Sequence, residues 1–418
     1  MSSTVEASAL QPQQATRRTG VALTMLLMAV LGEMCLAADF YGFAAVISLV
    51  SKDLALTESQ AGLVQGAFGV SFALGMLFWA PLGRKMSSKQ LYLIGLTGSG
   101  ALMIVQMYAN SFGELVLLRL VVGFFDAAVW IGSMKIVMQW FQPKRQGLIM
   151  GIILGAYSLA ITLDFAIGLP YAMANGWREF FFVLGVLTLS VGVITQFVLR
   201  PGPFVDPHDI ARRGVKVFSE VFQQRWIWIA ICGIFGALFS IGATATWVIP
   251  SYIQTQNMDP SLAPTIGMIM GLSQVGFLLL GGYMSDKLSR FTMIRVAILL
   301  TIISALLCVA SAIWPFSVNT LMLVATLCGV GVFGGGAIFA LIGEKYGSDL
   351  GPAAAGYAEM FGVLGSFVAP AIMGMVLTAS GSFATAFWTF AIVESALLIA
   401  LIIMMRQARS AASPVPAR

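Results

Sequence analysis

Apolar stretches long enough to cross a lipid bilayer follow one another along almost the whole chain of 418 residues. A transmembrane helix needs about 20 mostly apolar residues. Charged residues make up only 10% of the chain, whereas soluble domains carry about 25%, so polar side chains are too few to cover the surface of a soluble protein. The chain is therefore predicted to be an all-α membrane protein with twelve transmembrane helices, at 21–48, 60–82, 90–110, 114–138, 147–170, 179–199, 226–249, 263–284, 292–314, 318–342, 354–378 and 384–405.

Lysine and arginine gather in alternate loops between these stretches. The loops on one side have only Lys52 and Arg178. Because cytoplasmic loops carry an excess of basic residues, we expect both termini to be cytoplasmic in a multi-pass protein of a cell membrane, such as a bacterial inner membrane. The basic side holds Arg17, Arg18, Arg84, Lys85, Lys89, Lys144, Arg145, the segment from Arg200 to Arg225, the cluster from Lys287 to Arg295, Lys345 and the C-terminal arginines.

Polar segments divide the chain into two membrane parts. The segment 200–225 is the longest polar loop, and it is interpreted as a cytoplasmic linker between six-helix halves at 21–199 and 226–405. Residues 1–20 and 406–418 are expected to be cytoplasmic tails. The first apolar run is too long for a signal peptide and carries Glu33 and Asp39, so no signal peptide is predicted.

The two halves are expected to be pseudo-symmetric repeats. The stretch APLGRKMSSK at 80–89 and the stretch GGYMSDKLSR at 281–290 each follow the second span of a half. Aligning Arg84 with Asp286 gives an offset of 286 − 84 = 202 residues, close to half the chain. Such a duplication is typical of transporters whose binding site lies between two repeats near the bilayer midplane.

The two charged stretches are candidate gates. In the second, Gly282 permits close helix approach, while Asp286 can cap a helix or pair with basic groups such as Arg290. In the first, Arg84 and Lys85 stand at the matching place. The alternative interpretation is a plain cytoplasmic loop, which accounts for the basic residues but not for Asp286.

These stretches resemble a motif of a known family. GYMSDKLSR, from Gly282 to Arg290, is similar to the loop signature Gly-x-Leu-Ala-Asp-Arg-x-Gly-Arg-Lys of the major facilitator superfamily. The first copy departs from it, since Arg84 stands where the family has Asp. This departure suggests that Asp286 carries more of the gating than its counterpart does elsewhere.

Three further segments resemble the same family. LLRLVVG at 117–123 is similar to its Arg-x-x-x-Gly motif on the fourth helix, and GWREFFFVLG at 176–185 resembles the start of its sixth helix. WFQPKRQG at 140–147 resembles a loop of organic-anion and nitrate branches, with Gln146 in place of Arg. The resemblance covers essentially the whole chain. It implies a secondary transporter, active as a monomer among membrane lipids, that works by alternating access.

Ionisable residues inside the spans are candidate functional groups, because a charge at bilayer depth is costly. Asp39 is expected to accept protons, or alternatively to form a static ion pair with Arg119. Arg119 could grip a substrate carboxylate in bidentate fashion, or serve only to pair Asp39. Asp126 lies seven residues after Arg119, which places both within about 20° on one helix face, and is a candidate for substrate or proton contact.

Other polar groups at depth extend this set. Asp164 and Glu359 are further candidates for proton coupling, and Gln274 is a candidate substrate contact in the second half. Glu33 and Glu394 are weaker candidates, because a protonated carboxyl group can simply hydrogen-bond between helices. Lys135 is interpreted as extending its amine towards the cytoplasmic surface.

The expected function is proton-coupled uptake of a small polar organic solute, with an organic anion favoured because of Arg119 and the WFQPKRQG segment. The alternatives are a proton-driven exporter of drugs or metabolites with the same fold, a cationic or zwitterionic solute, and a receptor without transport. The basic residues lie mostly in short clusters between the spans, which argues against a nucleic-acid partner. A single histidine and four cysteines without paired spacing predict no enzyme, no metal site and no cofactor.

Overall fold

The computed structural model describes residues 2–56, 58–203, 217–259 and 262–410, and every regular element within these ranges is helical. The first part contains α1 (Ser2–Asp53), α2 (Glu58–Gly83), α3 (Ser88–Gln106), α4 (Phe112–Trp140), η1 (Pro143–Arg145), α5 (Gln146–Leu163), η2 (Asp164–Gly168), α6 (Leu169–Asn175) and α7 (Trp177–Val198). The second part contains α8 (Val217–Gln223), α9 (Trp226–Thr255), α10 (Ala263–Lys287), α11 (Arg290–Ile313), α12 (Val318–Cys328), η5 (Gly329–Val332), α13 (Gly335–Gly362), α14 (Leu364–Ser380) and α15 (Phe383–Ser410).

Serine residues fix the starts of several long helices. Ser87, Ser111, Ser289 and Ser317 each accept the backbone N–H of the residue three positions later with their side-chain oxygen. Such a cap satisfies a donor that the helix itself leaves without a partner. At Ser87 the side chain of Gln90 returns a bond to the cap backbone, which completes a capping box.

Ten stretches of the described chain are long and apolar enough to cross a membrane. Two of the expected spans, 318–342 and 354–378, fall within one stretch, Val318–Leu377. The expected span at 90–110 corresponds to α3, which is not among the ten stretches. Its 19 residues include Lys, Gln, Ser and Gly, and these residues lower its hydropathy.

Several expected spans contain breaks that sequence reasoning did not anticipate. The span at 147–170 changes to a π-helical turn at Asp164–Gly168, and the span at 318–342 tightens to a 3₁₀ turn at Gly329–Val332. Within α13, Gly347 has φ +68°, a conformation that glycine adopts without steric cost. It separates the end of one expected span from the start of the next.

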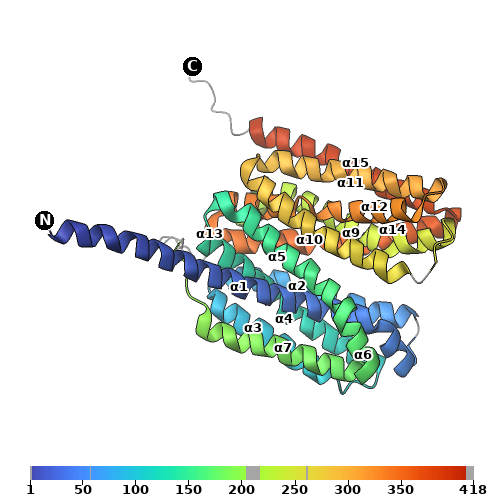
Figure 1. Cartoon of the computed structure of the whole chain (residues 1–418), viewed down its shortest axis with the longest axis horizontal. Coiled ribbons are helices and arrows are strands. Elements are labelled where there is room, and N and C mark those ends of the chain that lie inside the picture. The colour runs from blue at the N-terminus through green and yellow to red at the C-terminus, as the bar shows by residue number, and fades with distance from the viewer. Residues whose placement is uncertain (1, 57, 204–216, 260–261, 411–418) are drawn as a thin grey trace.

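The helices form two groups that meet along three helices. In Figure 1, α1–α7 occupy the lower part of the view and α9–α15 the upper part, with α5, α10 and α13 between them. Helix α5 packs along α10, and α13 packs against α2, α4 and α5. The start of α1 and the end of α15 lie at the same end of the molecule (Figure 1).

The expected polar segments are partly helical. Helix α1 begins at Ser2, so it continues through the predicted tail at 1–20, where the helix-forming residues Ala and Gln are frequent. Within the predicted linker 200–225, residues 217–223 form the short helix α8, and 204–216 lie outside the described residues. Of the predicted tail 406–418, residues 411–418 lie outside them as well.

Candidate functional site

A cavity of about 110 Å³ lies between the two helix groups. Helices α1, α2, α4 and α5 contribute side chains from one group, and α9, α10, η5, α13 and α14 contribute from the other. Its walls are mainly apolar and aromatic. Its polar side chains are Glu33, Tyr41, Trp130, Tyr157, Ser158, Gln274, Glu359 and Ser366.

Two glutamates from opposite helix groups reach this cavity. Glu33 comes from α1 and Glu359 from α13, and their carboxyl groups lie close enough to interact electrostatically. The Ser133 hydroxyl donates to Glu33 Oε2 at 3.2 Å, whereas Oε1 has no hydrogen-bond partner among the described residues. The Tyr41 and Tyr157 rings meet edge to face, 6.0 Å apart, beside both glutamates.

The cavity contains some of the predicted site residues and not others. Gln274 and Glu359 line it. Arg119, Asp126 and Asp164 do not belong to its described lining. Sequence reasoning gave Glu33 little weight and missed both tyrosines, although the spacing of eight residues between Glu33 and Tyr41 puts them on one face of a helix.

Arg119 is fully buried inside the first helix group. Its guanidinium donates to the backbone carbonyls of Asp39 at 2.5 Å and Phe40 at 2.7 Å. It also donates to Gln65 Oε1 at 3.3 Å, and it lies over the Phe68 ring at 4.8 Å. It therefore holds the backbone of α1 rather than facing the cavity.

The alternative of an ion pair between Asp39 and Arg119 is wrong for this conformation. Asp39 Oδ1 instead accepts a hydrogen bond from the Thr188 hydroxyl at 3.0 Å. The ion pairs formed by described residues within 4.0 Å do not include Arg119. Sequence spacing put the two residues at similar depth but could not show that the arginine would turn to the backbone.

Three buried aspartates are incompletely paired within the described part of the chain. Asp39 Oδ2, both carboxyl oxygens of Asp126 and Asp164 Oδ2 have no hydrogen-bond partner there. Asp39 and Asp126 are fully buried and close enough to interact electrostatically. Their proposed part in proton coupling stays a prediction.

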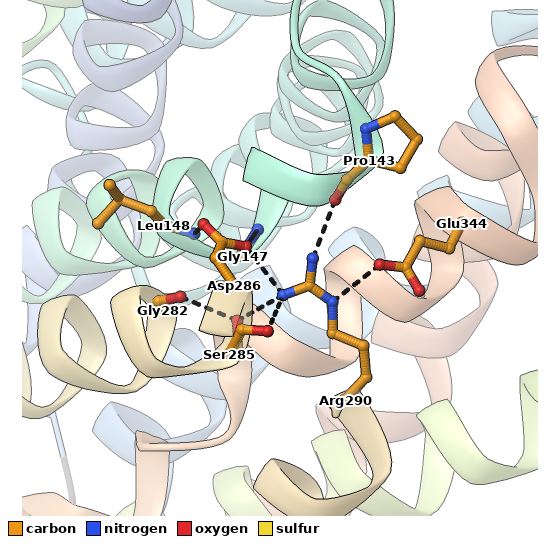
Figure 2. Close-up of polar contacts among 8 residues, drawn as sticks. All are labelled: Pro143, Gly147, Leu148, Gly282, Ser285, Asp286, Arg290 and Glu344. Carbon is orange, nitrogen blue, oxygen red and sulfur yellow. Dashed lines mark hydrogen bonds and ion pairs between the residues drawn. The ribbon is translucent and has the colours of Figure 1, made fainter. Parts of the chain in front are cut away.

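Asp286 connects the two helix groups at the end of the bundle that carries the basic loops, which we call the basic end. Its carboxylate oxygens accept the backbone N–H groups of Gly147 at 3.0 Å and Leu148 at 2.9 Å (Figure 2). Both N–H groups belong to the first turn of α5, where backbone donors have no partner within the helix and negative charge is favoured. A residue of one group thus caps a helix of the other.

Arg290 joins this cap to two further segments. Its guanidinium contacts Asp286 Oδ1 at 2.9 Å and Glu344 Oε1 at 2.9 Å, and it donates to the Pro143 carbonyl at 2.9 Å (Figure 2). Pro143 lies just before α5, whereas Glu344 lies on α13. We call the contacts of Asp286 and Arg290 with these segments the α5–α10 contact.

Small residues allow the close approach at this contact. A methyl group on Gly282 would come within 2.6 Å of the Gly147 carbonyl oxygen and 3.1 Å of Gly151 Cα. Both obstacles are backbone atoms, which cannot rotate away. Gly282, which the sequence predicted to permit close helix approach, therefore faces Gly147 and Gly151 across the two helix groups.

Arg84 forms a second bridge at the basic end, which we call the α2–α13 contact. It makes an ion pair with Asp349 of α13 and lies 3.6 Å from Glu220 of the linker helix α8. Tyr346 of α13 donates to the Val221 carbonyl at 3.0 Å, so α8 is also attached to α13. Lys85 is exposed beside Arg84, and the structure assigns it no described gate partner.

An ion pair connects two helices at the end of the bundle opposite the basic end. Arg178 pairs with Asp53, and Trp177 Nε1 donates to the same carboxylate at 3.1 Å. These hydrogen bonds from Arg178 and Trp177 hold the pKa of Asp53 below its usual value. The pair ties the end of α1 to the start of α7.

The described residues contain no group of three or more His, Cys, Asp or Glu side chains that could hold a metal ion. Cys308 and Cys328 lie 3.6 Å apart between their sulfur atoms. Both are buried in an apolar cluster of the second helix group.

The sequence matches the family model described as Major Facilitator Superfamily over residues 29–348 and 248–418. A probable L-galactonate transporter of Escherichia coli K12 is 22% identical over 417 residues, covering 94% of this chain and 92% of the relative. A bicyclomycin resistance protein homolog of Haemophilus influenzae is 24% identical over 279 residues, covering 65% of this chain and 70% of the relative.

Solved structures share the fold. The fucose:proton symporter FucP of Escherichia coli superimposes with a TM-score of 0.74, at 15% identity, over 91% of this chain and 98% of that chain. A structure of FucP in the outward conformation gives a TM-score of 0.75 with the same coverage. At this level of identity the likeness concerns the arrangement of the helices alone.

Proposed function

Because the chain belongs to the Major Facilitator Superfamily, we propose that it is a proton-coupled carrier that takes up a small polar organic solute by alternating access. The observation that carries this proposal is the cavity between the two helix groups, with Glu33 from one and Glu359 from the other. A site formed by both groups changes its exposure when one group rocks against the other. The chain is a member of a transporter family and not an enzyme.

Proton coupling is assigned to the buried carboxyl groups. Asp39, Asp126, Asp164 and Glu359 are the proposed proton acceptors, since a carboxylate without a partner is costly at bilayer depth and protonation removes that cost. Asp39 and Asp126 lie near the Arg119 guanidinium. A change in the position of Arg119 would alter the electrostatic cost of charging both, and this links conformation to proton uptake.

The α5–α10 and α2–α13 contacts serve as the gate in this proposal. Both lie at the basic end, which the distribution of Lys and Arg assigns to the cytoplasm. Opening the cavity to the cytoplasm would separate Asp286 from α5 and Arg84 from Asp349. Both contacts therefore stabilise the conformation whose cytoplasmic side is closed.

The expected organic anion depended on Arg119 as the group that would bind a carboxylate. In this conformation the Arg119 guanidinium is occupied by the carbonyls of Asp39 and Phe40. The name of the L-galactonate relative supports an acidic solute. Because no arginine reaches the described lining of the cavity, we propose the transport reaction without restricting the solute to anions.

A proton-driven exporter is the second candidate. It is supported by the mainly apolar and aromatic wall of the cavity, which suits amphipathic compounds. The name of the bicyclomycin resistance relative points the same way. Import and export differ in the direction of the solute gradient that a proton gradient builds.

The test uses purified protein in proteoliposomes that contain a pH-sensitive dye. A thermal-shift screen of carboxylates, sulfonates, sugars, amino acids and cationic drugs first supplies ligands, since a ligand at 100 times its Kd adds about 2.7 kcal/mol of stability. Addition of a ligand should then move protons into the vesicles in uptake, or out of them in export. Asp39→Asn should abolish accumulation driven by the gradient and leave solute exchange intact. Unchanged accumulation in this variant would contradict the role of Asp39.

A further inference from the structure

The charged side chains that face the cavity are both acidic. Glu33 and Glu359 line it, and its described lining includes no Lys, Arg or His. Glu359 makes no ion pair with a described residue, and Glu33 Oε1 has no hydrogen-bond partner within the same ranges. Two carboxyl groups that line one apolar space and lie close enough to interact electrostatically must bind either protons or a cation.

The rest of the wall is rich in aromatic rings. Phe40, Tyr41, Phe68, Phe72, Trp130, Tyr157 and Phe339 all line the cavity. The faces of such rings attract organic cations, and their area favours an apolar body. An ammonium group between the two glutamates, with its apolar part against these rings, would satisfy both features of the wall.

The same wall suits a polyhydroxylated acid poorly. Outside the two glutamates, its described polar side chains are two tyrosines, one tryptophan, one glutamine and two serines. A sugar acid needs a hydrogen-bond partner for most of its hydroxyl groups, and its carboxylate would meet two further carboxyl groups. Arg119, the group that could offset this repulsion, is directed at backbone carbonyls outside the cavity.

We propose that the cavity binds a small amphipathic organic amine, with its ammonium group between Glu33 and Glu359 and its apolar part against the aromatic wall. This assignment rests on the proposed function, because it names the solute class of the same transport site. It holds for transport in either direction. Each helix group supplies one of the two carboxyl groups, so the bound amine connects the two groups directly.

Three probes of nearly equal size and shape separate the effect of charge from that of shape. Phenethylamine is cationic at neutral pH, phenethyl alcohol is neutral and phenylacetate is anionic. Binding of each to the full-length protein in detergent is measured by titration calorimetry. We expect phenethylamine to bind at least about tenfold more tightly than phenylacetate, the alcohol being intermediate, since a like charge in a buried site is strongly rejected.

Matched variants test the two carboxyl groups. Glu33→Gln and Glu359→Gln should each weaken phenethylamine binding by about tenfold or more and leave the alcohol nearly unaffected. Glu394→Gln is the control, because Glu394 is, like Glu33, a fully buried glutamate of a candidate membrane span but is absent from the described lining of the cavity. Binding to this control should stay within about twofold of the parent protein.

The outcomes separate the solute class from the transport function. Preferential binding of phenylacetate, amine affinity unchanged in both cavity variants, or no amine binding at millimolar concentration would each overturn the amine assignment. If phenylacetate binds and moves protons in proteoliposomes, the transport function stands and the amine assignment fails. If the amine binds as expected but no solute of the wider screen moves protons, the site assignment stands and proton-coupled transport fails.

Discussion

The Asp286 carboxylate accepts the backbone N–H of Gly147 at 3.0 Å, across the contact between the two helix groups. The interaction between a carboxylate and a helix N-terminus stabilises the arrangement that contains it by about 0.3–2 kcal/mol. This contribution exists only while α10 lies against α5. It therefore biases the balance between conformations rather than the folding of either helix group alone.

Asp286→Asn should shift the protein towards the conformation open at the basic end. The amide keeps the shape of the side chain but loses the charge that interacts with the α5 N-terminus and with Arg290. We expect the open population to rise several-fold, corresponding to about 1 kcal/mol. Spin labels at the exposed positions Lys89 and Leu288 would report this by pulsed distance measurement. Lys287→Gln, at the next position of α10, is the control and should leave the distances unchanged.

Exchanging the charged side chains of Arg84 and Asp349 should restore the closed conformation and the transport rate that each single substitution impairs. Arg84→Asp alone places an acid beside Asp349 and Glu220, and we expect a loss of about 1–3 kcal/mol from the closed conformation because like charges then face each other. Arg84→Asp combined with Asp349→Arg should recover at least half of the lost transport rate. A double variant that is as impaired as the worse single variant would show that the pair does not act as a gate.

Gly282→Ala should prevent the full closure of the α5–α10 contact. The added methyl group would meet the Gly147 carbonyl oxygen at 2.6 Å, and overpacking of this kind costs about 1–3 kcal/mol. The same spin-label distances should lengthen. Gly276→Ala on the same helix is the control, because no heavy atom lies within 4 Å of the added methyl group. Equal behaviour of the two variants would exclude a steric role for Gly282.

The ion pair between Asp53 and Arg178 should make the free energy of unfolding depend slightly on pH in the acidic range. Since folding lowers the pKa of Asp53 from its ordinary value of 3.8, its stabilisation is complete above pH 3.8 and is lost as the pH falls through the lower, folded value. The pair is largely exposed, so at neutral pH Asp53→Asn should cost less than about 1 kcal/mol. The melting temperatures of the parent protein and of Asp53→Asn should become equal as the pH is lowered below the folded-state pKa of Asp53.

A mutant cycle distinguishes the ion pair from other effects of the substitution. Arg178→Gln should reproduce the loss seen in Asp53→Asn, and the double variant should be no less stable than either single variant. Additive losses would mean that the two side chains act independently.

The sequence was sufficient to predict most of the helical architecture, because bilayer thickness imposes a length that apolar stretches reveal directly. The expected span at 292–314 corresponds to α11, and that at 179–199 corresponds to α7. The π-helical turn at Asp164 and the 3₁₀ turn at Gly329–Val332 were not predicted, whereas the break at Gly347 falls in the connection expected between the spans 318–342 and 354–378. Both turns depend on neighbouring helices, which the hydropathy of one segment does not describe.

The site was less predictable, because periodicity shows which residues share a helix face but not what that face contacts. Arg119 and Asp126 do share burial within the first helix group, yet neither belongs to the described lining of the cavity. Glu33 was ranked below them although it reaches the cavity. The transport roles of Asp39, Asp126, Asp164, Gln274 and Glu359 stay predictions, as do the boundaries of the two halves.

The repeat relates the partner of Arg84 to the contact between Asp286 and Gly147 that the structure shows. The offset that aligns Arg84 with Asp286 also aligns Gly147 with Asp349, since 349 − 147 = 202. Asp286, the counterpart of Arg84, is the acidic member of its contact, and it binds backbone N–H groups at the N-terminus of α5. Arg84 is the basic member of the other contact, and it binds Asp349, the counterpart of Gly147. The two contacts at the basic end are thus equivalent in place and opposite in charge.

This reversal of charge has an evolutionary consequence. If the gene arose by duplication, the two halves descend from one shorter sequence. Two copies of the present first half would set Arg84 against the electropositive start of α5, and two copies of the second would set Asp286 against Asp349. In a symmetric pair of either half, like charges would therefore oppose the contacts at the basic end.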